Sequence, residues 1–156
     1  MKKRTLLVSG ILLLLLAGLK WARHLSQYMD VTFGDEAQYL RYGLDLFQTI
    51  KKDWGPSYNL WYKFLSFFQS NPVSLFYLNY QVTAIVLAVL LFVFLMRYNI
   101  SFFISIWLSF CFLLSPTVID TWPRVSHFAV IVLLMFLIAV RNIELKSRKM
   151  ILMSLA

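Results

Sequence analysis

The residues with the clearest chemical potential are two adjacent acids, Asp35 and Glu36, which open the segment GDEAQYLRYGLDL. They follow an apolar N-terminal run and begin an amphipathic stretch that extends over 37–50. On a helical projection, Glu36 points to the middle of the apolar face and Asp35 to its flank. The opposite, water-facing stripe consists of Arg41, Asp45, Gln48 and Lys52.

An ionised carboxylate on an apolar face is costly unless it is partnered, and such groups are frequently functional. The pattern therefore favours acid–base chemistry at the pair, with both carboxylates directed away from the water-facing stripe. The alternative is structural. Asp35 would then be an N-cap residue, and the acidic first turn would complement the helix dipole.

Three further side chains could bind an anionic ligand, namely Lys63, Arg124 and His127. Arg124 is the best of them for a phosphate, because a guanidinium group binds oxyanions in a bidentate manner. Its alternative role is to anchor the membrane interface and to pair with Asp120. Lys63 could equally contact solvent or lipid headgroups, and His127 could be an ordinary interfacial histidine. The chain has no D-x-D motif, so we predict neither a metal ion nor a cofactor.

The composition places these residues in a membrane protein. Hydrophobic residues make up 60% of the chain and charged residues only 14%, whereas about a quarter of a soluble domain is charged. The formal net charge is +8, but the basic clusters lie at the ends of apolar runs, which indicates orientation in a membrane rather than nucleic-acid binding. The single Cys111 lies inside an apolar run and is expected to be inert packing.

We therefore predict an all-α, multi-pass membrane domain over 1–156. It has four spans and the start of a fifth, and outer loops lie at 24–76 and 115–126. The predicted spans are 5–22, 77–96, 100–114 and 127–140, with a partial run at 150–156. The N-terminal Lys2-Lys3-Arg4 and the apolar run after it resemble a signal peptide, but no small-x-small cleavage site follows, which favours an uncleaved anchor. The positive-inside rule then places the N-terminus in the cytoplasm and both loops outside the cell membrane.

A second amphipathic segment occupies 57–70, after the helix-breaking Trp54-Gly55-Pro56. Its polar stripe consists of Asn59, Lys63, Ser66 and Ser70, and most other positions are aromatic or aliphatic. A helix of this kind lies in the headgroup plane rather than spanning the bilayer. We expect its aromatic residues to serve in packing and in the membrane interface rather than in sugar stacking.

This order of parts resembles the N-terminal portion of a GT-C superfamily glycosyltransferase. It is most similar to the polyprenyl-phosphate-sugar-dependent branch that includes protein mannosyltransferases and aminoarabinose transferases. The resemblance rests on the basic N-terminus, the first span, the acidic pair in GDEAQYLRYGLDL and the segment WGPSYNLWYKFLSFF. It implies that Asp35 is the base that deprotonates the acceptor hydroxyl and that Glu36 orients acceptor or donor. The lipid phosphate that leaves needs no general acid.

The resemblance also implies partners, namely membrane lipid, a polyprenyl-phosphate-linked sugar and further helices of the same gene product. The superfamily core has more spans than are found here, and the last apolar run is too short to cross a bilayer. The chain is therefore expected to be a fragment that is inactive by itself. The alternative is a small non-enzymatic membrane subunit whose amphipathic helices bind lipid or a partner and whose acidic pair caps a helix.

Overall fold

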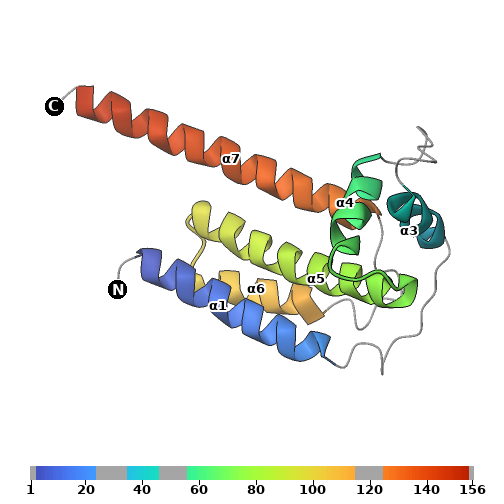
Figure 1. Ribbon diagram of the computed structural model, residues 1–156. Coiled ribbons are helices and arrows are strands. Elements are labelled where there is room, and N and C mark those ends of the chain that lie inside the picture. The colour runs from blue at the N-terminus through green and yellow to red at the C-terminus, as the bar shows by residue number, and fades with distance from the viewer. Residues whose placement is uncertain (1–2, 24–34, 46–55, 115–124, 155–156) are drawn as a thin grey trace.

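The computed structural model describes residues 3–23, 35–45, 56–114 and 125–154, with side chains described as far as residue 144. Every regular element in these ranges is an α-helix, which confirms the predicted all-α class (Figure 1). The helices are α1 (Lys3–Ala22), α3 (Glu36–Leu44), α4 (Pro56–Ser66), α5 (Pro72–Arg97), α6 (Phe102–Leu114) and α7 (Val125–Ser154).

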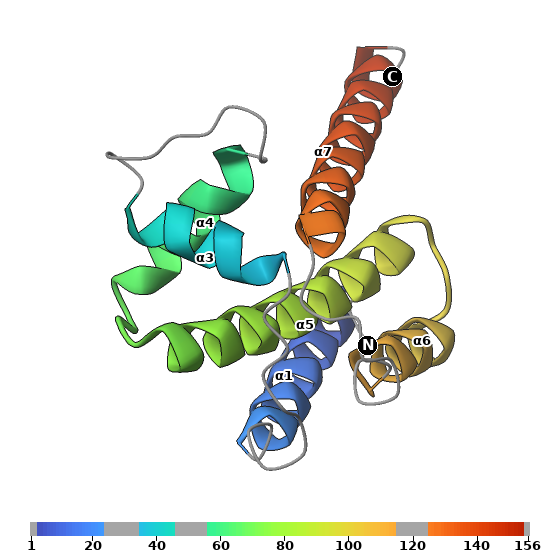
Figure 2. The ribbon, with the colours of Figure 1, turned by 90° about the vertical axis from the view of Figure 1, so that its right-hand side faces the viewer.

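Helix α5 is the central element, because α1, α6, α7 and α4 all pack against it (Figures 1 and 2). Its start is well defined. The Asn71 side chain accepts hydrogen bonds from the backbone N–H groups of Val73 at 3.0 Å and Ser74 at 3.2 Å, and Pro72 occupies the first helical turn. It ends before Asn99, whose positive φ of 63° turns the chain into α6.

Helices α1 and α5 approach closely through glycines. A Cβ atom on Gly10 would lie 2.1 Å from the ring of Phe92, and one on Gly18 would lie 2.6 Å from Ile85. The buried positions of α1 recur every four residues, at Gly10, Leu14, Gly18 and Ala22. Small residues at this spacing are typical of helix pairs that pack in a bilayer.

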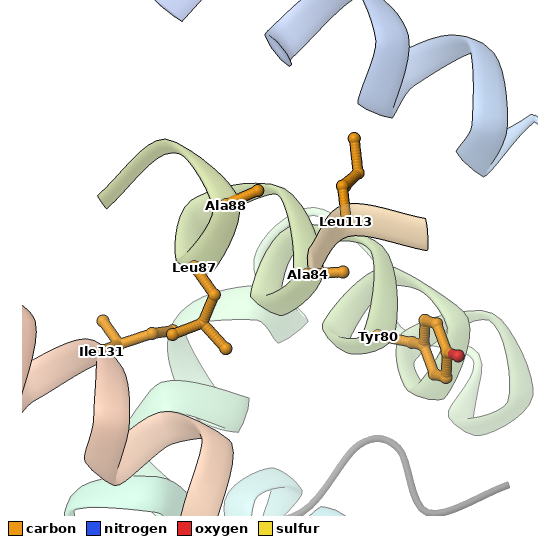
Figure 3. Close-up of a cluster of buried hydrophobic side chains, with 6 residues drawn as sticks. All are labelled: Tyr80, Ala84, Leu87, Ala88, Leu113 and Ile131. Atoms are coloured by element: carbon orange, nitrogen blue, oxygen red, sulfur yellow. The ribbon is translucent and has the colours of Figure 1, made fainter. Parts of the chain in front are cut away.

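The core of the bundle lies midway along α5 (Figure 3). Here α5 meets one residue of α6 and one of α7, and the buried side chains are Tyr80, Ala84, Leu87, Ala88, Leu113 and Ile131. A single apolar cluster therefore joins α5 to both α6 and α7.

Among the described residues, three helices are long and apolar enough to cross a membrane: α1, α5 and the part of α7 from Val125 to Glu144. They indicate a membrane protein. Helix α6 is also apolar but has only 13 residues, so it falls short of the predicted full span by length. Its surface is strongly hydrophobic, with Phe103 80% and Trp107 69% exposed, as expected of a helix that faces lipid.

Some element boundaries differ from those expected. Helix α5 begins at Pro72, before the expected start at Tyr77, because the cap at Asn71 initiates it. Helix α7 continues without a break to Ser154, so the run from residue 150 is continuous with it instead of forming a separate element. The described part of the first amphipathic helix ends at Leu44, and the remainder of the expected stretch to Ile50 lies outside the described residues.

Candidate functional site

The candidate site begins with two short helices, α3 and α4, that pack closely against each other beside the end of α5 where that helix begins (Figure 2). Gly43 makes this possible, since a Cβ atom at this position would lie 2.4 Å from Cβ of Tyr62 and 3.1 Å from the carbonyl oxygen of Asn59. Lys63 strengthens the contact by donating from Nζ to the carbonyl oxygen of Leu44 at 3.2 Å. A cation at this position satisfies an acceptor left free at the C-terminus of α3.

Glu36 lies in the interior of this junction and is only 6% exposed. Its Oε1 accepts hydrogen bonds from the hydroxyl groups of Tyr58 and Tyr62, both on α4 and both buried. The amide nitrogen of Asn79, on α5, lies 3.3 Å from the same oxygen. One carboxylate therefore joins three helices, and the prediction that Glu36 faces the apolar side of its helix is confirmed.

The direction of the hydrogen bonds around Asn79 follows from donor chemistry. The indole N–H of Trp61 can only donate, and it lies 2.7 Å from Oδ1 of Asn79; the Thr83 hydroxyl donates to the same oxygen at 3.2 Å. The Asn79 amide nitrogen must then donate towards the hydroxyl oxygens of Tyr58, at 2.8 Å, and Tyr62, at 2.9 Å. Each hydroxyl is left with its proton for Glu36, so the whole network is polarised towards the carboxylate.

Two opposing effects set the protonation of Glu36. Burial raises its pKa above the ordinary value because it removes water from the charged form, and this effect is the larger. The hydrogen bonds from Tyr58 and Tyr62 lower the pKa in part. Burial also raises the pKa of both tyrosines, and at Tyr58 the charge of Glu36 is the next largest cause. Both tyrosines therefore remain protonated donors.

Asp35 stands next to this network but on the outside. It is exposed, occupies the residue before α3, and its side chain makes no capping hydrogen bond. The expectation that the carboxylates point away from the water-facing stripe, towards the membrane or the protein body, is confirmed for Glu36, whereas Asp35 does not enter the protein interior. A helical projection is least reliable at the ends of a helix, where Asp35 lies.

The remaining predicted site residues lie in different places. His127 is half-buried in the first turn of α7, beside Phe128, whose ring packs 5.6 Å from Tyr58 and 5.7 Å from Trp61 between centroids. Lys63 is held by the α3 carbonyl described above. Arg124 and Asp120 lie outside the described residues. Within the described ranges, no group of three or more His, Cys, Asp or Glu side chains is placed to hold a metal ion.

Helix α4 lies with its polar stripe against protein rather than towards water. Asn59 is 1% exposed, and Lys63 is half-buried with its ammonium group in contact with α3. The exposed side of the helix and of the turn after it is apolar, and comprises Leu60, Phe64, Phe67 and Phe68.

A cavity of about 500 Å³ opens at the same end of the bundle, between the last turn of α1 and the first turns of α5. Tyr77 and Gln81 line it from α5, and Arg23 lines it from the end of α1. Gln81 also donates from Nε2 to the carbonyl oxygen of Ala22 at 2.9 Å, which fixes the two helices at this point. A cationic side chain and amide groups thus border a space large enough for a small polar ligand.

Sequence reasoning did not identify Tyr58, Tyr62 and Asn79 as partners of Glu36. One signal was present, because the two tyrosines are four residues apart and so lie on one helix face, as do Asn79 and Thr83. Arg23 was not singled out either, since a basic residue after a span ordinarily anchors the interface.

The fold and the junction together define a helical membrane protein with a buried carboxylate network at one end of its bundle. Comparison with family models, with curated proteins and with solved structures found no match to this chain.

Proposed function

We propose that the chain is the N-terminal part of a membrane glycosyltransferase that moves a sugar from a polyprenyl-phosphate donor to an acceptor on the outer face of the cell membrane. The proposal rests on the resemblance of the segment containing Asp35 and on one structural observation. That observation is the burial of Glu36 in a network contributed by α4 and α5, which fixes the start of α3 and leaves Asp35 exposed beside it.

The two acids then have different roles. Asp35 is the base, because an exposed carboxylate can reach the hydroxyl of an incoming acceptor. Glu36 is a positioning residue, because its hydrogen bonds hold the first turn of α3 in place. This refines the expectation from the resemblance that Glu36 contacts acceptor or donor.

In the reaction, the acceptor O–H gives its proton to the Asp35 carboxylate as the acceptor oxygen bonds to the anomeric carbon. The bond between that carbon and the phosphate oxygen breaks, and its electron pair leaves on the lipid phosphate. A cation must compensate the phosphate charge. Arg23, at the border of the cavity described above, is one candidate from this chain, and Arg124, Lys63 and His127 remain predictions for the same role.

The proposal includes a four-span topology in which α6 is a short membrane-embedded helix beside α1 and α5. Lys3 and Arg97 lie together at one end of the bundle, and α3 and α4 lie at the other (Figure 1). The positive-inside rule then assigns the first end to the cytoplasm and the Glu36 network to the outside. The direct test is sugar transfer from labelled polyprenyl-phosphate donors by membranes that contain the full-length protein or its Asp35→Asn variant.

A second candidate function is a non-enzymatic membrane subunit that binds lipid or a partner. The observation in its favour is the apolar exposed side of α4 and its following turn, where Phe67 is 78% and Phe68 is 70% exposed. In this case Glu36 would only stabilise the fold, and the Asp35→Asn variant would retain all function.

A further inference from the structure

A second cavity, of about 440 Å³, lies at the opposite end of the bundle from the Glu36 network. It opens between the first turns of α1 and the last turn of α5. Its lining residues are Lys3, Arg4, Leu7, Met96, Arg97 and Asn99.

Both sides of this cavity are held in place. Lys3 donates from Nζ to Oδ1 of Asn99 at 2.6 Å, which joins the start of α1 to the turn after α5. Asn99 lies next to the cavity because its left-handed backbone, with a φ of 63°, terminates α5 at this point. The two helices therefore meet at the cavity through a specific contact as well as through apolar packing.

The charge in the cavity is of one sign. Among its described lining residues three are cationic and none is acidic. The carboxylate of Glu144, which belongs to α7, is paired instead with Arg141 at 2.9 Å. Nε of Arg97 is buried and has no hydrogen-bond partner among the described residues, and the same holds for Nε of Arg141. Of these two arginines only Arg97 lines the cavity, and its planar guanidinium group suits the oxygens of a phosphate.

The walls of the cavity narrow the choice of acceptor. Leu7 and Met96 provide an apolar surface next to the cationic groups, and both belong to helices that are long enough to cross a membrane. A ligand that suits this combination has a phosphate group attached to hydrocarbon. Basic pockets between membrane helices are known to bind the headgroups of anionic lipids.

We propose that this cavity is a binding site for the phosphate headgroup of an anionic membrane lipid, with Arg97, Lys3 and Arg4 as its cationic contacts. General orientation of the chain by positive charge would not require three cationic side chains to line one cavity. It would also make Arg141, at the same end of the bundle, equivalent to Arg97. Arg141 does not line the cavity; it binds Glu144 and lies 5.1 Å from the centroid of the Tyr98 ring.

The test is native mass spectrometry of the full chain in mild detergent, titrated with dioleoyl-phosphatidylglycerol and, separately, with dioleoyl-phosphatidylcholine. We expect the anionic lipid to bind at least about tenfold more tightly than the zwitterionic one, as one strong charge-assisted contact would produce. We expect Arg97→Gln to weaken binding of the anionic lipid by a similar factor. The matched control, Arg141→Gln, should change it less than about twofold.

Two further arms keep the result decisive. Lys3→Gln and Arg4→Gln remove charge from exposed positions at the start of α1, so they should weaken lipid binding even if Arg97→Gln fails to fold. Inorganic phosphate should not displace the bound lipid, because it has no hydrocarbon for Leu7 and Met96 to contact. Equal binding of the two lipids, equal losses in Arg97→Gln and Arg141→Gln, unchanged binding in the Lys3 and Arg4 variants, or full displacement by phosphate would each overturn the assignment.

Discussion

Asp35 and Glu36 are adjacent in the chain but lie in opposite environments. Glu36 is 6% exposed and accepts hydrogen bonds from Tyr58 and Tyr62, whereas Asp35 is exposed to solvent. A helix begins between them, and the buried member determines where the exposed member stands. The proposed function is based on these two roles, with Glu36 as the positioning carboxylate and Asp35 as the accessible one.

The first prediction concerns the stability of the Glu36 network. In Glu36→Ala the hydroxyl groups of Tyr58 and Tyr62 lose the acceptor of their protons, and each buried donor left without an acceptor costs about 1–3 kcal/mol. Glu36→Gln keeps an acceptor oxygen in place and should be less harmful. We expect the thermal unfolding midpoint in detergent to fall most in Glu36→Ala, less in Glu36→Gln, and not at all in Gln38→Ala, which changes an exposed residue of the same helix. Equal midpoints for the two Glu36 variants would contradict the role of the network.

The second prediction concerns pH. Burial raises the pKa of Glu36, so the folded state holds this proton more tightly than the unfolded state does. The contribution of Glu36 is therefore fully present below its ordinary pKa and is lost as the pH rises through the raised value. The unfolding midpoint of the wild type, measured relative to that of Glu36→Gln, should therefore fall as the pH rises over this range. A difference that is constant with pH, or that moves in the wild type's favour, would contradict the raised pKa.

The third prediction concerns the packing of α1 on α5. Gly10→Ala places a Cβ atom 2.1 Å from the fully buried ring of Phe92, so it should destabilise the helix pair by about 1–3 kcal/mol. Phe92→Leu removes the ring and should restore part of this loss in the double variant. Thermal unfolding of the wild type, the two single variants and the double variant forms a complete cycle. Additive effects would show that the two residues do not compete for space.

The fourth prediction concerns orientation. In a Cys111→Ser background, Asp45→Cys lies at the end of α3 and Ser101→Cys lies in the turn after α5, and both positions are exposed. A membrane-impermeant maleimide should label Asp45→Cys in intact cells, and Ser101→Cys only after the cells are permeabilised. Labelling of both variants in intact cells, or the reverse pattern, would reject the proposed topology.

Helical periodicity was enough to place Glu36 on the buried side of its helix, because that argument needs only the spacing of residues within one segment. It failed for the orientation of α4. Apolar residues lie on most sides of that helix, and hydrophobicity does not distinguish lipid from the protein interior. The buried side contains Tyr58 and Asn59, and the exposed side contains Phe64.

The partners of Glu36 were also beyond a reading of the sequence. Asn79 is 43 residues away, and its approach to Glu36 depends on how α3 and α4 fold back onto α5. The length of α5 was underestimated for a local reason that the sequence does contain, namely Asn71 followed by Pro72, a favourable helix start. A long-range contact such as that between Asn79 and Glu36 can be found only in the structure, whereas a helix start such as Asn71-Pro72 can be found in the sequence.

The most direct test of the central claim compares Asp35 and Asp45, the two aspartates that flank α3. Membranes containing the full-length protein would be supplied with radiolabelled polyprenyl-phosphate mannose and polyprenyl-phosphate aminoarabinose, and transfer to membrane acceptors would be measured. We expect Asp35→Asn to lower transfer by about 10²-fold or more, as the loss of a general base does, while Asp45→Asn at the other end of α3 leaves it unchanged. Normal transfer by Asp35→Asn at normal expression would contradict the assignment of Asp35 as the base.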